Sequence, residues 1–447
     1  MHAMGAPDAH TSLPGRTLGV TTAGLLVVAS MIGTGVFTTT GYLVRDIGSL
    51  PAVLVAWGLG GVTALFGALA YGELVAALPH NGGEYQLLGR IYHPAVGFVS
   101  GWTSLIVGFS APVAASAIAF GEYLNAALAT DAIPPVASGL ALIVGVSLVH
   151  AVGVGAGGRI QNALTIGKTV LIVAFIAAGL VAGDFARFTE DTGHPFASAL
   201  VSPGFAVGLI FVSFAYSGWN AAAYVAGEVR QPERNLPRAL AAGTGLVTAL
   251  YFGINAAFLC AAPAAELAQA NERVGHVAAV GLFGPVAGRF LAGLIAIGLV
   301  SMVGALAMTG PRVYEAMGRD YPLLKLLATR RGGGGPVYAI ALQSSVAAVM
   351  ALTASFDTLL EFIGFTLSLF AALTVVGVFV LRAREPGLAR PYRAWGHPVT
   401  SVLFVALMLW MIAHTMIQQP LVSLVGLGTI AAGLALWAGT RTPSPTR

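Results

Sequence analysis

The sequence predicts an all-α membrane protein with about twelve transmembrane helices, and three observations support this fold class. Of 447 residues, 57% are apolar and only 9% are charged, whereas a soluble domain is about 25% charged. Apolar runs of the ~20 residues that a bilayer span needs recur from Leu18 to Leu436. The mean hydropathy is +0.83, and the short polar stretches between the runs leave no room for a sizeable soluble domain.

The apolar runs divide the chain into two groups of five spans followed by two more. Residues 18–182 hold the first group, residues 204–381 the second, and residues 398–438 the last two spans. Because five is an odd number, the second group must be inverted relative to the first. The predicted spans are 18–44, 50–78, 94–126, 134–152, 160–182, 204–227, 238–262, 286–317, 336–354, 358–381, 398–416 and 420–438.

The placement of charge predicts the orientation of these spans. Basic residues collect on the cytoplasmic side of a membrane protein. With the N-terminus inside, seventeen of the 22 Lys and Arg residues fall on that side and four outside, and Lys168 remains within a span. We therefore expect a multi-pass protein of the cell (inner) membrane, with cytoplasmic tails at residues 1–17 and 439–447. The net charge of +4 follows from this topology and does not indicate a nucleic-acid partner.

The sequence offers no pattern typical of an enzyme. It contains no acid/base cluster, nucleophile elbow or metal-ligand spacing, so we expect no catalytic residues, no metal and no cofactor. The basic loop from Arg330 to Pro336 lacks the strand and the Lys-Ser/Thr ending of a phosphate-binding loop. Membrane lipid surrounds such a chain, and nothing in the sequence indicates its oligomeric state.

Two predicted spans are interrupted near their middle. Gly33-Thr34-Gly35 lies in the first span and Tyr216-Ser217-Gly218 in the sixth, and glycine weakens a helix. Glycines are also used as packing notches between membrane helices, and the first interruption alone does not distinguish these interpretations. Both breaks, however, lie in the opening helix of a five-helix group, which is the sequence pattern that best indicates a transporter's binding site.

The chemistry of a broken helix suits a zwitterion. Unwinding frees amide N–H groups at the start of the following half-helix and carbonyls at the end of the preceding one. A carboxylate would bind the amides near Thr34 and Gly35, and an ammonium group the carbonyls near Met31, Phe214 and Ser217. The predicted substrate-binding residues are Met31, Ile32, Gly33, Thr34, Gly35, Phe214, Ala215, Tyr216, Ser217, Gly218 and Asn220.

Several segments resemble the amino acid, polyamine and organocation (APC) superfamily, and within it the L-type and cationic amino acid transporters and their bacterial relatives. The similar segments are Met31 to Phe37; Glu73 with Leu78-Pro79 and Gly82-Gly83-Glu84-Tyr85; Phe214 to Asn220, continuing through Gly227-Glu228-Val229 to Pro232–Arg238; and, more loosely, Arg312 to Asp320. The resemblance implies a LeuT-type fold, a 5+5 inverted repeat with two helices appended, and alternating access around a central site. It also implies that the Phe214 ring is an outer gate and Asn220 a polar wall of the site.

Lys168 is the one basic residue placed inside a span, and such a residue is by default a functional candidate. A buried lysine gives up its proton more readily, so Lys168 is a candidate for proton or ion coupling. The resemblance implies that it lies against the broken first helix, where it takes the place of a sodium ion. The alternative is a lysine that reaches the cytoplasmic interface.

Other charged residues leave their roles open. For Glu73, pairing with loop arginines at the cytoplasmic end is favoured over proton binding, whereas the sequence does not decide the role of Glu361. Five residues of alternating charge join the sixth and seventh spans and predict a mutually paired latch or an inner gate: Glu228, Arg230, Glu233, Arg234 and Arg238.

These patterns favour a secondary amino acid transporter, coupled to protons or working as an exchanger, over three other classes. A sensor that binds without transport should carry a long signalling tail, a channel should show a repeated filter or charge ring, and a membrane enzyme should show catalytic residues. Near the breaks the chain offers apolar side chains and no carboxylate, which indicates small or apolar neutral amino acids. The alternative substrates are cationic amino acids, polyamines or other amines.

Overall fold

The computed structural model describes residues 16, 18–152, 157–190, 193–330 and 335–440, and within them the secondary structure is helical apart from one isolated bridge between Leu18 and Val229. The predicted tails, residues 1–17 and 439–447, fall largely outside this part of the chain. The helices are α1 (Val20–Met31), α2 (Gly35–Ile47), α3 (Leu50–Ala77), α4 (Glu84–Ile91), α5 (Pro94–Thr103), α6 (Ala111–Leu128), α7 (Pro135–Val152), α8 (Gly157–Ala182), α9 (Phe196–Leu200), α10 (Pro203–Ala215), α11 (Pro232–Ala261), α12 (Ala264–Gln269), α13 (Val274–Asp320), α14 (Val337–Thr353), α15 (Phe356–Arg384), α16 (Val399–Gln418) and α17 (Pro420–Gly439).

A helix lies in each of the twelve predicted ranges, but not every one has the length of a full span. Eight helical stretches of the described chain are long and apolar enough to cross a membrane, or nine when the bent pair of α1 and α2 is taken as one span. The apolar helices α7, α10 and α14 are shorter. The all-helical membrane fold is therefore confirmed, whereas the count of twelve spans stays a prediction.

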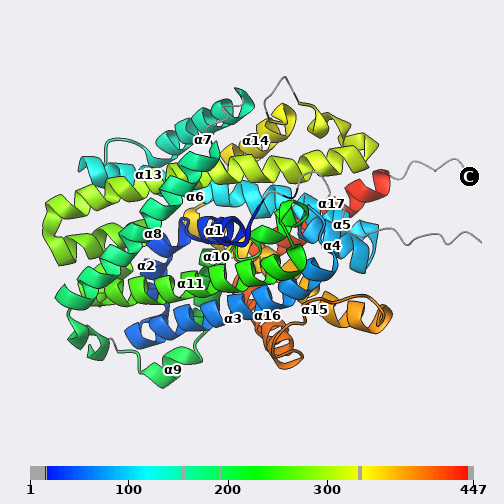
Figure 1. The fold of residues 1–447 in the computed structure, drawn as a ribbon. Helices are drawn as coiled ribbons and strands as arrows, with labels where there is room; N and C mark the ends of the chain where they lie inside the picture. Colours follow the sequence, from blue (N-terminus) through cyan, green and yellow to red (C-terminus); the bar gives the residue numbers. More distant parts are fainter. Residues whose placement is uncertain (1–15, 17, 153–156, 191–192, 331–334, 441–447) are drawn as a thin grey trace, which may run out of the picture.

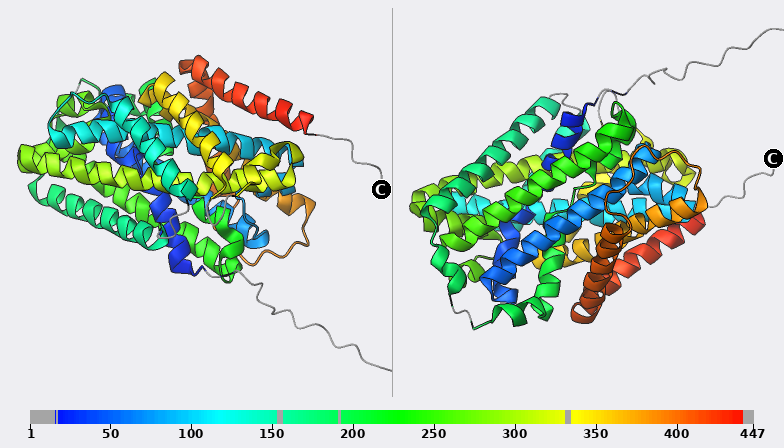
Figure 2. Two further views of the ribbon diagram at one scale, coloured as in Figure 1. Left: turned by 90° about the horizontal axis from the view of Figure 1, so that it is seen from above. Right: turned by 60° about the horizontal axis from the view of Figure 1, so that its bottom comes forward.

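The long helices form the body of a bundle. Figure 1 shows α3, α11 and α13 running in nearly the same direction, and α3 packs against α11. α13 packs against α6, α7 and α14. The last two helices lie at the edge of the bundle (Figure 2).

The outer helices turn large apolar side chains away from the protein. Leu148 of α7, Val181 of α8, Phe290 of α13 and Leu421 of α17 are all more than half exposed. Such faces would be costly in water and suit hydrocarbon, in which a helix also satisfies its own backbone groups.

The connection between the seventh and eighth predicted spans differs from the predicted layout. The predicted spans 238–262 and 286–317 leave the stretch between them as a connection, but it holds α12, a short 3₁₀ turn and the first turns of α13. Gly284 has a φ of +81° and interrupts α13, so the predicted start of that span at 286 marks the point where the helix resumes. The apolar residues before Gly284 continue the helix because they also find a packing surface.

Two groups of charged residues are predicted to form pairs, and among the described residues only one of them does. The Glu73 carboxylate of α3 accepts hydrogen bonds at 2.7–2.8 Å from Arg382 of α15 and one of 2.7 Å from the Ala394 amide, with Arg390 at 3.7 Å. The predicted pairing of Glu73 with arginines is thus confirmed. The predicted pairing among Glu228, Arg230, Glu233, Arg234 and Arg238 is wrong for the described residues, among which no ion pair includes them.

Burial makes Glu73 far more important to stability than an exposed acid in a similar pair. Glu73→Ala leaves the Arg390 side chain, which is 7% exposed, without its carboxylate, and breaking a buried ion pair costs about 3–5 kcal/mol. Glu385 pairs with Arg90 at the surface, where ion pairs contribute little. We expect Glu73→Ala to lower the melting temperature in detergent strongly and Glu385→Ala to leave it nearly unchanged. Equal melting temperatures for the two variants would contradict this assignment.

Candidate binding site between two broken helices

The first break separates α1 from α2. The two helices are bent by 41°, and Ile32 leaves the helical region with a ψ of 84°. Gly33 and Gly35 flank Thr34 here, and a helix loses stability at each glycine. The interruption predicted at Gly33-Thr34-Gly35 is therefore present in the fold.

Side chains from other helices satisfy the polar groups that this break frees. The hydroxyl of Tyr251 on α11 donates to the Met31 carbonyl at 2.5 Å, and the Lys168 ammonium on α8 donates to the Ile32 carbonyl at 3.0 Å. The Thr34 hydroxyl lies 2.5 Å from that of Ser116 on α6. Two neighbouring helices, α8 and α11, thus replace backbone hydrogen bonds that lipid could not supply, and α6 adds a contact between side chains.

Lys168 faces the break and not a membrane surface. Its side chain is 8% exposed, and the alkyl chain lies beside Gly298 of α13, where an added Cβ would stand 3.3 Å from Lys168 Cδ. No carboxylate of the described residues forms an ion pair with it. The favourable partner of the charge is instead the carbonyl end of α1, where the helix dipole is negative.

The second break follows α10. The helix ends at Ala215, the chain turns through Gly218 with a φ of +95°, and a 3₁₀ helix, η3, runs from Ala221 to Glu228. The Ser217 amide donates to the Phe214 carbonyl at 2.9 Å. The Tyr216 hydroxyl donates to the Trp57 carbonyl of α3 at 3.1 Å, which ties the break to a neighbouring helix.

The two breaks are in direct contact, and only glycine permits it. A Cβ on Gly35 would stand 2.5 Å from Ala215 Cα, and one on Gly218 would stand 2.6 Å from the Ser30 carbonyl oxygen. Backbone therefore meets backbone at both places. Segments almost two hundred residues apart in sequence form one junction.

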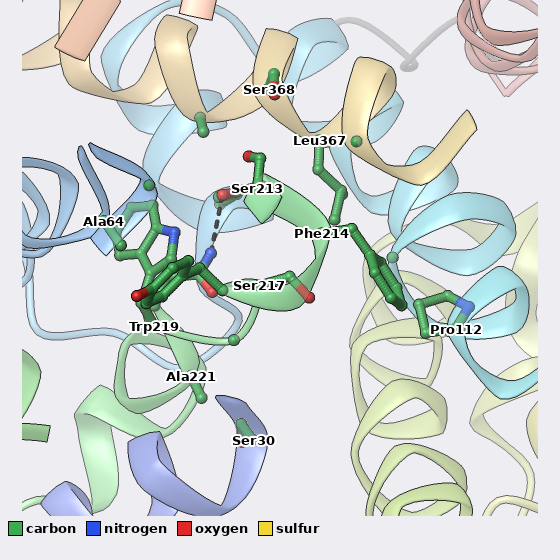
Figure 3. Close-up of a pocket in the computed structure, with 18 of the residues that line it drawn as sticks. Ser30, Ala64, Pro112, Ser213, Phe214, Ser217, Trp219, Ala221, Leu367 and Ser368 are labelled. Carbon is green, nitrogen blue, oxygen red and sulfur yellow. Dashed lines mark hydrogen bonds between the residues drawn. The ribbon is translucent and has the colours of Figure 1, made fainter. Parts of the chain in front are cut away.

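A cavity of about 150 Å³ opens beside this junction. Of the predicted binding residues, the second break supplies Phe214, Tyr216, Ser217, Gly218 and Asn220 to its lining. Figure 3 shows Phe214 between Leu367 and Pro112, with Trp219 near Ala64 on the opposite side. Seven Ser and Thr side chains line the cavity: Ser30, Thr63, Ser104, Ser213, Ser217, Thr309 and Ser368.

The first break lies next to this cavity but does not line it. Met31 to Gly35 and Ala215 are absent from the lining, to which α1 contributes Ser30. Met302 of α13 stands in between, since it lines the cavity and its Sδ would lie 3.0 Å from a Cβ on Gly33. The Met302 side chain thus covers the first break.

The expectation that no carboxylate lies near the breaks is wrong. Glu84, the first residue of α4, lines the cavity and accepts a hydrogen bond of 3.0 Å from Asn220 Nδ2. Gly82 and Gly83, with φ of +115° and +55°, turn the chain so that α4 starts beside the cavity. The two glycines before Glu84 indicate a turn at this point. Because Glu84 is far from both breaks in the sequence, they do not predict its contact with Asn220.

A distorted segment of the third predicted span also lines the cavity, and the sequence did not predict this. Ser104–Ser110 is a π-helical segment, η1, between α5 and α6, and Ser104, Gly108 and Phe109 line the cavity. Such segments occur often at functional sites. Gly108 and the β-branched Ile106 and Val107 weaken a helix here, but such residues occur throughout the predicted spans and do not predict a π-helical segment.

Known proteins similar to this chain match it along almost its whole length. The sequence profile of an amino acid permease family matches residues 18–437. The chain is 29% identical over 435 residues to the serine/threonine exchanger SteT of Bacillus subtilis, which covers 95% of this chain and 97% of that protein. It is 29% identical over 423 residues to the human b(0,+)-type amino acid transporter 1, covering 91% and 83% of the two chains. The mouse Asc-type amino acid transporter 1 is 26% identical over 435 residues, covering 94% and 80%.

The contact between the two breaks predicts that a methyl group added at Gly218 destabilises the protein more than one added at Gly145. In Gly218→Ala the new methyl group meets the Ser30 carbonyl while the backbone keeps a left-handed φ, and overpacking of this kind costs about 1–3 kcal/mol. Gly145→Ala on α7 places its methyl where no atom lies within 4 Å. We expect thermal unfolding in detergent to show a clear loss for Gly218→Ala and no loss for Gly145→Ala. A Gly218→Ala protein as stable as the parent would mean that the two breaks are not in contact.

Proposed function

The chain belongs to the amino acid permease family, and we propose that it moves small neutral amino acids across the cell membrane as a secondary active transporter, coupled to protons or to exchange. Membership of this family makes the chain a multi-pass amino acid transporter and not an enzyme. The observation that carries the finer proposal is the contact of two broken helices beside a small, hydroxyl-lined cavity.

The architecture that we propose is the LeuT-type 5+5 inverted repeat. Residues 18–182 would form the first repeat, residues 204–381 the second, and residues 398–438 the two appended helices, with both termini in the cytoplasm. Support comes from the position of each break in the opening helix of its repeat. Alternating access then follows if one group of helices tilts against the other around the junction of Gly35 with Ala215.

The substrate that we propose lies between the breaks as a zwitterion. Its carboxylate binds the amides at Thr34 and Gly35, where α2 begins and the helix dipole is positive. Its ammonium group binds carbonyls of Met31, Phe214 and Ser217. Since Met302 covers Gly33 in this conformation, binding requires that side chain to swing aside, which the flexible methionine chain permits.

The size and polarity of the cavity support a small side chain. A protein cavity of about 150 Å³ holds a ligand of the size of benzene, and this cavity has a similar volume of about 150 Å³. Alanine, serine and threonine have a comparable number of heavy atoms. The seven Ser and Thr hydroxyls of the lining suit a hydroxyl on the substrate, and one similar protein is named a serine/threonine exchanger.

A permease for cationic amino acids, polyamines or other amines is the second candidate, because Glu84 brings a carboxyl group to the cavity. A cationic side chain would pair with that group. A sensor that binds amino acids without moving them would keep the same cavity, so transport itself must be measured.

Transport of a panel of labelled substrates into proteoliposomes tests the proposal. We expect serine, alanine and threonine to be taken up or exchanged. Arginine should be excluded by its size, and putrescine because it has no carboxylate for the amides at Thr34 and Gly35. Protein-free liposomes are the control for leakage. Binding without uptake would identify a sensor, uptake of arginine or putrescine would favour the second candidate, and failure of every amino acid to bind would remove the proposal.

Lys168 provides a second test, for which the chain contains a matched control. We propose that its ammonium holds the first break open in the place of a sodium ion and takes part in ion coupling. A hydrogen bond from a charged group is worth about 1.5–3 kcal/mol, so Lys168→Ala should reduce uptake by roughly 10- to 100-fold and alter its dependence on pH. The other lysine, Lys325, is exposed, and Lys325→Ala should transport normally. An unchanged pH profile for Lys168→Ala would remove its proposed part in coupling.

A further inference from the structure

Glu84 is a buried acid beside the cavity. Neither the proposed binding of substrate at the breaks nor the proposed role of Lys168 gives it a function. Its side chain is 6% exposed, yet it lines the cavity together with Asn220 and Tyr224. Oε1 accepts hydrogen bonds from the Tyr71 hydroxyl of α3 at 2.5 Å and from Asn220 Nδ2 at 3.0 Å. These two donors fix the orientation of the carboxyl group, and neither occupies Oε2.

No positive charge of the described chain is paired with this carboxyl group. The arginines of the Glu73 cluster, Arg382 and Arg390, are paired with Glu73. On α4 itself, Arg90 pairs with Glu385, and Tyr85 donates to Asp320 of α13. The elements packed around Glu84 present only neutral groups to it. They are Tyr71 of α3, Asn220 directly before η3, Tyr224 of η3, Ser104 of η1, Tyr314 of α13 beyond Tyr224, and Thr374 of α15 beside Tyr71.

The physical consequence is a carboxyl group with two accessible forms. A buried carboxylate without a counter-charge is costly, so the group keeps its proton while the cavity is closed to water. Burial raises the pKa of Glu84 above its ordinary value, while the hydrogen bonds from Tyr71 and Asn220 act in the opposite direction. When the cavity admits water, Oε2 can release the proton, and the two donors on Oε1 stabilise the carboxylate that remains.

Asn220 connects this group to the second break. Asn220 ends the unwound segment that begins at Tyr216, and its side chain donates to Glu84 while its carbonyl accepts the Ala223 amide at the start of η3. A substrate bound at Ser217 and a proton bound at Glu84 thus act on the same short segment. Each then changes the affinity for the other by the same factor.

Resting on the proposed transport function, we propose that Glu84 is the proton-binding carboxyl of the transport cycle, loading one proton with the amino acid and releasing it to water on the other side of the membrane. The proton leaves Oε2 as the carboxylate forms, and no other bond is made or broken. Lys168 then acts at the first break, through the Ile32 carbonyl, and Glu84 acts at the second, through Asn220.

Glu84→Gln separates proton movement from amino acid movement. The carboxamide oxygen still accepts from Tyr71 and Asn220, and the side chain is neutral like the protonated acid. In proteoliposomes with an internal pH dye, we expect the parent protein to acidify the lumen during serine uptake. Glu84→Gln should retain exchange of labelled for unlabelled serine at equal pH, but lose both the acidification and accumulation driven by a pH gradient.

Two further variants make the result decisive. Glu361 is similarly buried, at 7% exposed, but does not line the cavity, and Glu361→Gln should keep proton movement. If Glu84→Gln is inactive in every assay, Glu84→Asp decides, since a titrating carboxyl should restore uptake with a shifted pH profile, and an unshifted profile overturns the proposal.

Some outcomes would contradict the proposed role of Glu84 and leave the proposed transport function standing. Serine uptake by the parent without proton movement would do so, as would a Glu84→Gln protein that still acidifies the lumen. Arginine transport that is lost in Glu84→Gln would instead identify Glu84 as a site for a cationic side chain. Failure of the parent to move any amino acid would be a failure of the transport function itself.

Discussion

The fold depends on one constraint, which is that an unwound backbone inside a bilayer must find its hydrogen bonds within the protein. At the first break, Tyr251 and Lys168 donate to the carbonyls of Met31 and Ile32. At the second, the Tyr216 side chain donates to the Trp57 carbonyl. The helices that surround the breaks, α3, α8 and α11, are therefore held in place by polar contacts as well as by apolar packing, and these contacts determine where a cavity can form.

Contact between the breaks makes them one mechanical unit. Gly35 rests on Ala215 and Gly218 on the Ser30 carbonyl, so neither segment can shift alone without a clash or a gap. Packed interiors respond to such shifts by changing between discrete arrangements more than by deforming smoothly. A ligand that spreads the two segments would thus be felt by α1 and α10 together, which is what a transporter that alternates between two openings needs.

The sequence predicted the features whose cause is local and missed those that arise from packing. The breaks could be predicted because glycines at Gly33, Gly35 and Gly218 weaken a helix wherever it lies. The pairing of Glu73 followed from its place at a helix end. The approach of Glu84 to Asn220 joins segments 136 residues apart, and no periodicity encodes it. The same reason explains the missed π-helical segment and the charged cluster from Glu228 to Arg238, whose alternating signs do not determine which side chains meet.

The two buried ionisable groups near the breaks differ in a way that argues for different roles. Lys168 lies at the carbonyl end of α1, where the dipole favours a positive charge, and its ammonium has a carbonyl partner at 3.0 Å. Glu84 is subject to opposing influences, since burial favours the acid while the Tyr71 hydroxyl, the Asn220 amide and the start of α4 favour the carboxylate. Burial disfavours the charged form of both groups, but only Glu84 lines the cavity and can therefore exchange a proton with water when the cavity opens. On this physical ground we assign proton exchange with the cavity to Glu84.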